Sequence, residues 1–427
     1  MNVLAAFGKQ TFSSFAIPNY RRYFVGQGLS HIGSWMQTVA LGWLVIVLTG
    51  SGVALGSVLA VRFAPLLFGA IIAGNLVDSF DKRRLLIATQ SAAAIISLTM
   101  GALIYAGVIA MWMVYVAALS KGLVDMLDRP ARQTFVHEIV GPENLRNAVS
   151  LNSSMANTAR ALGPLFAGSI IATLGIAVCY LANALSFVAF IVALLSLKSG
   201  EMHREARDGR KVEHVFAGVR YVASMPLIRT ILITMAVIGT LAYEFQVSLP
   251  LLAHTTFLGD AADYAALLSA MGVGSIAGGL FTASRKDVVK SEFIAWAFLF
   301  GVSVCIVALM PSLSLAVLAM VVVGFFSVAM SATGTTMIQL ASEAHMRGRV
   351  MALWSMAIFG STLIGAPIIG FIGEYGSPRT ALMLGGGAAI IASLFAARRL
   401  LESYAVFPIP PFIKIRREEA AVENTRA

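Results

Sequence analysis

The sequence predicts an all-α membrane protein in which twelve transmembrane helices form two six-helix halves. Of its 427 residues, 58% are hydrophobic and only 12% are charged, which is too little charge to keep such a chain in water. Apolar runs of roughly 20 residues, the length that crosses a bilayer, recur along the whole chain. The second half also repeats features of the first at an offset near 202 residues.

Twelve apolar runs divide evenly between the two halves. The first six lie near residues 22–48, 52–77, 85–107, 111–130, 148–174 and 177–197. The other six lie near residues 229–252, 264–284, 292–311, 313–340, 350–373 and 380–400. Between them, Lys198 to Arg220 is polar and carries both signs of charge, as expected of a connection. We therefore expect an N-terminal segment, a first bundle, a linker, a second bundle and a tail, at 1–20, 21–198, 199–227, 228–400 and 401–427.

Basic residues predict the orientation of the chain in the membrane. Of 31 Lys and Arg residues, 27 lie in the termini or in the loops after even-numbered helices. The loops after odd-numbered helices contain only Arg379, and Arg62, Lys121 and Arg160 lie inside spans. Because basic loops stay on the cytoplasmic side, we expect both termini in the cytoplasm and a multi-pass chain in a bacterial inner membrane. The net charge of +10 then reports topology and does not indicate nucleic-acid binding.

The internal repeat is clearest in the fifth and eleventh spans. Leu151, Gly163 and Gly168 recur as Leu353, Gly365 and Gly370. Parallel repeats of this kind place a substrate path at the interface between the two halves. We therefore expect the substrate to bind between the bundles.

The connection between the second and third spans carries a motif. Residues 74–84 read Gly-Asn-Leu-Val-Asp-Ser-Phe-Asp-Lys-Arg-Arg. This loop resembles the signature of the major facilitator superfamily, with Gly74, Asp78, Arg83 and Arg84 at its motif positions. The resemblance implies the twelve-helix major facilitator fold and a role for Asp78 in holding one gate state. Thr282 stands at the acidic position in the second half, so such a contact would be one-sided; the alternative is a loop that only sets topology.

The fifth span contains Gly163, Pro164 and Gly168, which resemble the glycine–proline motif of antiporters and exporters in that superfamily. Pro164 removes an intrahelical hydrogen bond, and small neighbours permit close helix packing. Ala159 and Ala167 stand where glycines are common in the motif. The alternative is that these residues only pack the helix, because Gly and Pro are ordinary in membrane helices.

Three further segments, residues 19–24, 35–44 and 346–350, resemble the enterobactin-exporter branch of the superfamily. The resemblance implies a monomeric secondary transporter that exports an amphipathic small molecule, such as a drug-like compound or a siderophore, at the expense of the proton gradient and without a cofactor or metal. A lipid or lysophospholipid flippase and an importer of the same fold remain alternatives. A membrane-embedded enzyme, suggested by His137-Glu138, is disfavoured because no His-Glu-x-x-His, nucleophile elbow or phosphate loop is present.

Ionisable side chains inside spans are costly and mark candidate sites for proton coupling. Glu244 is the only acid well inside a span of the second half. A carboxylate that is neutral when buried and charged when hydrated can couple proton flow to alternating access. The alternative is a fixed ion pair between Glu244 and Arg62 or Arg160. His31 is a second candidate, as a proton relay or a hydrogen-bond donor to cargo, and its alternative is a packing role.

Charged residues also follow one face of the fourth span. Lys121, Asp125, Asp128 and Arg132 are separated by three- and four-residue helical steps. Asp125 could exchange a proton, and Asp128, Arg129 and Arg132 could exchange ion pairs at a cytoplasmic gate. The alternative is two permanent pairs, Asp125 with Arg129 and Asp128 with Arg132.

The cations inside the first half suggest the character of the cargo. Arg62, Lys121 and Arg160 outnumber the nearby acids and suit an anionic or carboxylate-bearing amphiphile. Trp35, Gln37 and Tyr243 are expected to line the substrate cavity with them, although aromatic side chains can equally belong to the core or face lipid.

Overall fold

The computed structural model of the protein describes residues 13–203, 215–285, 288–343 and 346–401. Within these ranges, the side chains of residues 70–75, 78, 199, 215–217 and 359 are left out of the description. All regular elements of the described ranges are helical. Most of the expected N-terminal segment, part of the expected linker and nearly all of the expected tail lie outside the described residues.

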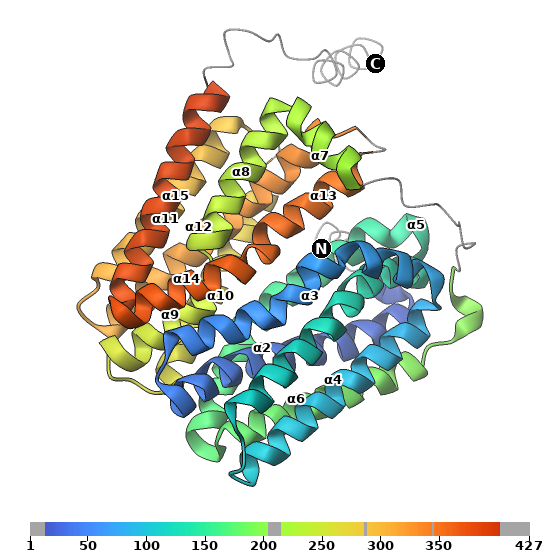
Figure 1. Ribbon diagram of the computed structural model, residues 1–427. Coiled ribbons are helices and arrows are strands. Elements are labelled where there is room, and N and C mark those ends of the chain that lie inside the picture. Colours follow the sequence, from blue (N-terminus) through green and yellow to red (C-terminus); the bar gives the residue numbers. More distant parts are fainter. Residues whose placement is uncertain (1–12, 204–214, 286–287, 344–345, 402–427) are drawn as a thin grey trace, which may run out of the picture.

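The first half begins with a short turn and continues with long helices (Figure 1). These elements are η1 (Ser13–Ala16), α2 (Pro18–Thr49), α3 (Gly52–Ser79), α4 (Lys82–Tyr105), α5 (Met111–Leu174), α6 (Ile176–Leu195) and η2 (Ser199–Glu201). Gly50 ends α2 with a positive φ of 62°, a conformation that glycine adopts without steric cost. Ser51 then caps α3 by accepting from the backbone N–H of Ala54, and Asp81 caps α4 in the same way.

Helix α5 is longer than the sequence predicts. Its 64 residues would extend roughly 95 Å as one straight helix, far beyond the thickness of a bilayer. Gly141, with φ 69° and ψ 176°, instead separates two arms, residues 111–140 and 142–174. The helix continues well past residue 130, where the predicted span ends, because Phe135 and Ile139 are fully buried at a four-residue spacing and keep that segment helical.

The second half is built from shorter pieces. These are α7 (Val215–Ser224), α8 (Pro226–Leu241), α9 (Phe245–Leu251), η3 (Leu252–Thr256), α10 (Ala261–Ala283), α11 (Lys290–Leu309), α12 (Leu313–Ala341), α13 (Arg347–Ser355), η4 (Met356–Gly360), α14 (Thr362–Tyr375) and α15 (Pro378–Leu401). Two of the predicted spans are interrupted, the first at residues 242–244 and the second at the π turn η4. The expected linker contains the amphipathic helix α7.

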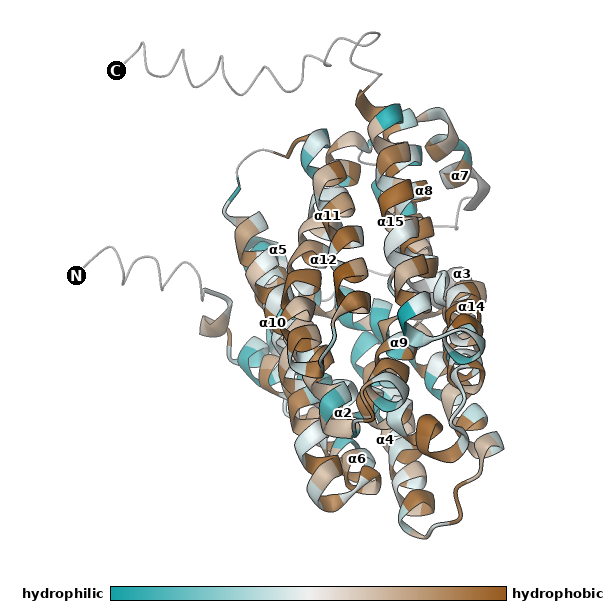
Figure 2. Cartoon of the chain, turned by 90° about the vertical axis from the view of Figure 1, so that its left-hand side faces the viewer, coloured by the Kyte–Doolittle hydropathy of each residue, from teal (hydrophilic) through white to brown (hydrophobic). Residues whose placement is uncertain are grey.

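Ten helices in the described ranges are long and apolar enough to cross a membrane. The two arms of α5 are not among them, so the count of twelve crossings remains a prediction, whereas the all-helical membrane architecture is confirmed. Large apolar side chains such as Leu185, Leu318 and Ile391 are 65–71% exposed on the outside of the bundle. Figure 2 shows the same hydrophobic character on the helices that face the viewer, as expected of a surface solvated by lipid.

The two halves meet along two pairs of helices. One pair is α3 with α14, which lie side by side in Figure 1, and the other is the second arm of α5 with α10. We call these contacts the α3/α14 seam and the α5/α10 seam. Successive spans are antiparallel, so the connections at Gly50, Gly107 and Gly175 share one end of the molecule, here called the Gly175 end. The connection at residues 80–81, the C-terminus of α6 at Leu195 and the C-terminus of α10 at Ala283 share the other, here called the linker end. The exact limits of the two bundles remain predictions.

Candidate transport pathway

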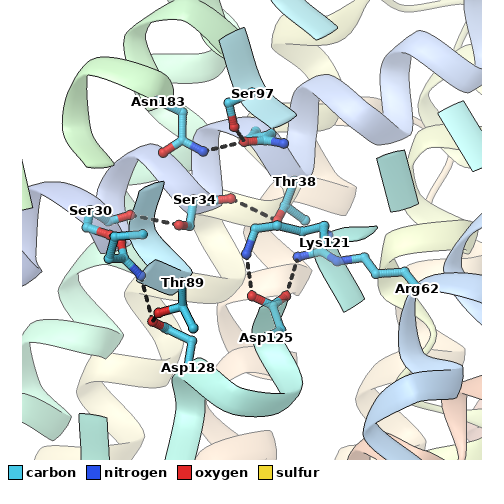
Figure 3. A network of polar contacts seen from close by, with 12 residues as sticks. Ser30, Ser34, Thr38, Arg62, Thr89, Ser97, Lys121, Asp125, Asp128 and Asn183 are labelled. Atoms are coloured by element: carbon cyan, nitrogen blue, oxygen red, sulfur yellow. Dashed lines mark hydrogen bonds and ion pairs between the residues drawn. The ribbon is translucent and has the colours of Figure 1, made fainter. Parts of the chain in front are cut away.

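Asp128 and Arg132 form a buried ion pair on the first arm of α5. Arg132 Nε donates to Asp128 Oδ2 at 2.6 Å, and each side chain is about one-tenth exposed. The Asp128 carboxylate also accepts hydrogen bonds from Thr89 at 2.8 Å and Gln90 at 2.6 Å, both on α4 (Figure 3). Arg132 reaches Ser30 of α2 at 3.3 Å. The pair thus joins three helices, and both its permanence and its gating role remain predictions.

Asp125 lies one turn earlier and bridges two cations (Figure 3). One carboxylate oxygen binds Lys121 Nζ, and the other lies 3.5 Å from Arg62 Nη2 of α3. The three side chains are only 12–17% exposed. Asp125 therefore pairs with Lys121 and Arg62, and its predicted pair with Arg129 remains a prediction. One buried carboxylate serves two cations, which leaves this cluster with an excess positive charge.

Gln37 connects α2 to two other helices. Its Oε1 accepts from Ser97 Oγ of α4 at 2.7 Å and from Asn183 Nδ2 of α6 (Figure 3). Gln37 also borders a cavity of about 20 Å³ that Arg62 and Lys121 line as well. A cavity of this size has about the volume of one water molecule, and Gln37, Arg62 and Lys121 supply polar groups to a lining that is otherwise mostly apolar. The cluster around Asp125 therefore has room for water but not for cargo.

Arg160, on the second arm of α5, has different neighbours from the other two cations. Its guanidinium carbon lies 5.4 Å from the centroid of the Trp35 ring of α2, within cation–π range. Its Nε is buried without a hydrogen-bond partner among the described residues. His31, one turn before Trp35 on α2, has its Nε2 3.3 Å from the amide nitrogen of Gln27.

Glu244 lies where α8 stops and α9 begins. Its backbone, at φ −80° and ψ 43°, departs from helical geometry. The residue is only 4% exposed, and its Oε1 has no hydrogen-bond partner in the described part of the chain. The Thr362 hydroxyl of α14 hydrogen-bonds to the carboxyl group. Within the described ranges neither Arg62 nor Arg160 forms an ion pair with it, so the alternative of a fixed ion pair is not seen in this conformation.

The segment opposite Glu244 is also irregular. The π turn η4 immediately precedes α14, and Gly365 of α14 packs against α8. A methyl group at Gly365 would overlap the Thr240 carbonyl and would lie 2.9 Å from Glu244 Oε1. Two interrupted helices therefore face each other around one buried carboxyl group.

Tyr243, next to Glu244, is anchored in the second half. Its hydroxyl lies 2.8 Å from Ser327 Oγ of α12, and its ring stacks on Phe300 of α11 with centroids 5.2 Å apart. These contacts place Tyr243 in the packing of the second bundle. Its predicted role in the cavity is untested.

The signature loop contacts its own half in the described residues. Arg83 donates from Nε to the Leu194 carbonyl and from Nη2 to the Leu195 carbonyl, both at 2.9 Å, at the C-terminus of α6. The backbone N–H of Arg84 donates to Asp81. The surroundings of Gly74 and the side chain of Asp78 lie outside the description, so the predicted gate contact of Asp78 is untested.

The repeated glycines of the fifth and eleventh spans have equivalent partners. Gly163 packs against α2 at Trp35, and its counterpart Gly365 packs against α8. Gly168 lies in the α5/α10 seam, where an added methyl would be 2.7 Å from the Ala265 methyl. Gly370 lies in the α3/α14 seam against the backbone of Gly52. In each repeat, one glycine brings two helices together within a half and the other brings the two halves together.

A carboxylate bridges the α3/α14 seam at the Gly175 end. Glu374 Oε2, at the end of α14, accepts from Ser51 Oγ at 2.5 Å and from the backbone N–H of Val53 at 2.9 Å. These groups form the N-terminus of α3, where negative charge is favourable. The side chains of α10 and of the second arm of α5 that are described form no hydrogen bond with each other, so the α5/α10 seam rests on close packing such as that of Gly272 against Ala161.

A cavity of about 530 Å³ lies beside the α5/α10 seam, toward the linker end. One wall consists of small polar side chains of α5: Ser150, Ser153, Ser154, Asn157 and Thr158. The opposite wall consists of α10, α11 and α12 and includes Phe281 and Trp296. Arg285 and Glu292 form an ion pair at its edge. A cavity of this volume accommodates a small organic molecule.

Several polar residues of the pathway were missed by the sequence reasoning, which followed charges. Gln90 and Asn183 stand inside apolar spans, and this is a signal that could have found them. Thr362 and Ser51 are single hydroxyl residues without such a signal. Glu374 lies near the end of a predicted span, where a carboxylate is unremarkable until its partner is known.

Comparison with known proteins agrees with this architecture. A sequence profile for transmembrane secretion effectors matches residues 9–407. The chain is 24% identical over 381 residues to the staphyloferrin A transporter of Staphylococcus aureus (strain NCTC 8325 / PS 47), covering 87% of this chain and 94% of the relative. It is also 24% identical over 399 residues to the enterobactin exporter EntS of Escherichia coli O1:K1 / APEC, covering 92% and 94%.

Solved structures share the fold at low sequence identity. A peptide transporter POT superposes with a TM-score of 0.73 at 13% identity, covering 90% of this chain and 94% of its own. A bacterial homologue of the human lysosomal transporter Spinster gives 0.68 at 12% identity, covering 91% and 96%. The profile match spans nearly the whole chain, and these relatives are transporters and not enzymes. The chain therefore belongs to the transmembrane secretion effector family of the major facilitator superfamily.

Proposed function

We propose that this protein is a proton-coupled secondary transporter that exports an amphipathic small molecule, of the kind represented by siderophores, by alternating access. The names of the two relatives support a siderophore-like cargo. The distribution of basic residues supports a linker end that faces the cytoplasm of a bacterial inner membrane. The large cavity then opens toward the side from which an exporter takes its cargo.

The observation that carries the proton coupling is the position of Glu244. A buried carboxyl group with one oxygen lacking a partner is stable only in its neutral form, whereas hydration lets it ionise. It lies between two interrupted helices, where a change of packing alters its access to water. Release and uptake of its proton can therefore accompany the change between the two access states.

The test measures cargo efflux with and without a proton gradient. Inverted membrane vesicles are incubated with a fluorescent amphipathic dye or with a catecholate siderophore in the medium. The rate of uptake into the vesicles is compared between wild type and Glu244→Gln. Gln keeps the shape and the neutral charge state but cannot release a proton. We expect the gradient to drive uptake by wild type. The uptake rate of the variant should be at least about tenfold lower, since loss of one charge-coupled step costs more than about 1.4 kcal/mol.

Glu201→Gln is the matched control. Glu201 forms an exposed ion pair with Lys198 outside the bundle, so its loss should leave transport unchanged. The rate of cargo movement could be unchanged both when the gradient is collapsed and when Glu244 is replaced by Gln. That result would contradict proton coupling through Glu244 and would favour a flippase or a facilitator of the same fold.

A further inference from the structure

The three cations inside the first half are not equivalent. Arg62 and Lys121 both bind Asp125, so their charges are partly neutralised in place. Arg160 forms no ion pair and no hydrogen bond with any described residue, and its buried Nε, like that of Arg62, lacks a partner among them. A guanidinium group is always charged, and a charge inside a membrane protein needs a partner. Of these three cations, Arg160 is thus the one without an anionic partner among the described residues.

Arg160 is held in a defined place by its neighbours. Gly163, one turn further along α5, packs against the Cβ of Trp35 and brings the two helices together. The guanidinium group then lies over the Trp35 ring, at 5.4 Å from its centroid. Tyr243 of the second half lies within electrostatic range of Arg160, so the site borders both halves. A stacked guanidinium keeps its donors free to form two parallel hydrogen bonds with a planar anion.

The large cavity is lined on α5 by residues that precede Arg160 in the same helix. Its polar wall follows the helix from Ser150 to Thr158, directly before Arg160. Immediately after Arg160, Ala161 touches Gly272 and closes the α5/α10 seam. The lining of the cavity on α5 ends at Thr158, so Arg160 and Trp35 lie beyond its end and do not line it. The cavity has hydroxyl and amide groups on one wall and aromatic rings on the other.

We propose that Arg160 and Trp35 bind the carboxylate of an anionic amphiphile whose body occupies the cavity between α5 and α10. The guanidinium group pairs with the carboxylate, the side chains of Ser154 and Asn157 hydrogen-bond to neutral polar groups, and Phe281 and Trp296 cover the apolar part. This inference deepens the proposed function by naming the chemical class of the cargo, an amphipathic organic acid, and it assigns the residue that recognises the acid.

The test uses a fluorescent probe that differs from its control only in charge. Binding of 4-(1-pyrenyl)butyrate and of its uncharged primary amide to the purified full chain in detergent is measured by fluorescence. We expect wild type to prefer the acid by about tenfold or more, the effect of a charge-assisted bidentate hydrogen bond. Arg160→Gln should remove that preference and leave the affinity for the amide unchanged. Arg160→Lys should retain part of it, because lysine keeps the charge but not the planar donors.

A second variant tests the cavity separately. Ser154 is exposed on α5, so Ser154→Trp fills the cavity without disturbing a packed core and should weaken binding of both probes. Arg62→Gln is the comparison for charge, because Arg62 already has Asp125 as its partner, and it should preserve the preference for the acid. Equal affinity of wild type for acid and amide, or a preference lost in Arg62→Gln and kept in Arg160→Gln, would overturn the proposal.

These measurements are independent of proton coupling. Probe binding in detergent requires no gradient, and the control Glu201→Gln should bind the acid as wild type does. Proton-driven transport without acid recognition by Arg160 would refute this inference alone. Acid recognition by Arg160 without any effect of the gradient would refute only the coupling.

Discussion

At the scale of single residues, we expect the carboxylate that Asp125 shares between two cations to stabilise the first half. Removing one partner of a buried ion pair leaves an uncompensated charge and costs about 3–5 kcal/mol in water-soluble proteins. Asp125→Asn would leave both Lys121 and Arg62 without their anion. We therefore expect it to lower the melting temperature of the detergent-purified protein by several degrees, as measured by thermal unfolding.

A double substitution separates charge balance from side-chain shape. Asp125→Asn combined with Lys121→Met has the same net charge in the cluster as wild type, because one anion and one cation are removed together. It should recover part of the lost stability. A melting temperature as low as that of Asp125→Asn alone would mean that the geometry of the ion pairs, and not the charge count, stabilises the helices.

The sequence identified most of these charges but not their partners. An ionisable residue inside an apolar run can be recognised from the sequence alone, which is why Arg62, Asp125 and Glu244 were identified. Pairs at helical spacing, such as Asp128 with Arg132, were also predictable. The contact of Asp125 with Arg62 depends on how α3 and α5 pack, and local spacing says nothing about that.

At the scale of elements, the interrupted helices α8/α9 and η4/α14 form the surroundings of Glu244. Their close contact depends on the missing side chain of Gly365, since a methyl group there would overlap the Thr240 carbonyl. We expect Gly365→Ala to force the two elements apart, to destabilise the protein by about 1–3 kcal/mol and to slow transport. Thermal unfolding and vesicle uptake of the dye measure the two effects.

Gly387→Ala is the matched control for this substitution. Gly387 lies in α15 with open space where its Cβ would be, so the added methyl meets no neighbour. Alanine is the better helix former by up to about 1 kcal/mol, so this variant should be at least as stable as wild type. If Gly365→Ala behaved like Gly387→Ala, the contact between α8 and α14 would not limit stability or transport.

Helix positions followed from apolar periodicity, whereas their irregularities did not. The predicted runs coincide with helices because burial in lipid requires continuous apolar segments with their backbone groups satisfied internally. The helical continuation of α5 past residue 130 was missed because that segment is polar overall and only one face is apolar. The breaks at residues 242–244 and at η4 carry no proline at the break itself, so they had no local signal.

At the scale of the whole molecule, the two seams that join the halves differ in chemistry. The α3/α14 seam includes the hydrogen bonds of Glu374 to Ser51 and Val53. Glu374→Gln removes the negative charge from the N-terminus of α3 and should favour a state that is open at the Gly175 end. The side chain is exposed, so the shift in population should be modest, roughly twofold to fivefold.

Spin-label distances report this equilibrium. Labels at Val47→Cys on α2 and Tyr375→Cys on α14, both exposed positions, would span the α3/α14 side in a background without Cys179 and Cys305. The Glu374→Gln variant should increase the fraction of long distances, whereas Glu201→Gln should not. Unchanged distributions would show that close packing, such as that of Gly52 against Gly370 and of Gly56 against Ala366, closes this seam without the carboxylate.

The division into two halves and the repeated glycines were predictable because duplication leaves a trace in the sequence. The access state that the structure shows was not predictable from the sequence, since both access states are built from the same residues. The position of the cavity beside the α5/α10 seam is a property of the state described here.

Because the two seams differ in chemistry, dissolved salt should affect the α3/α14 seam and the α5/α10 seam differently. Dissolved salt screens the exposed carboxylate of Glu374 and weakens its attraction to the start of α3, but it has no comparable effect on the contact of Ala161 with Gly272. Raising the ionic strength should therefore loosen one side alone, so that the halves tilt apart as a wedge and do not separate evenly. Distances measured across both seams in low and high salt would reveal such a tilt.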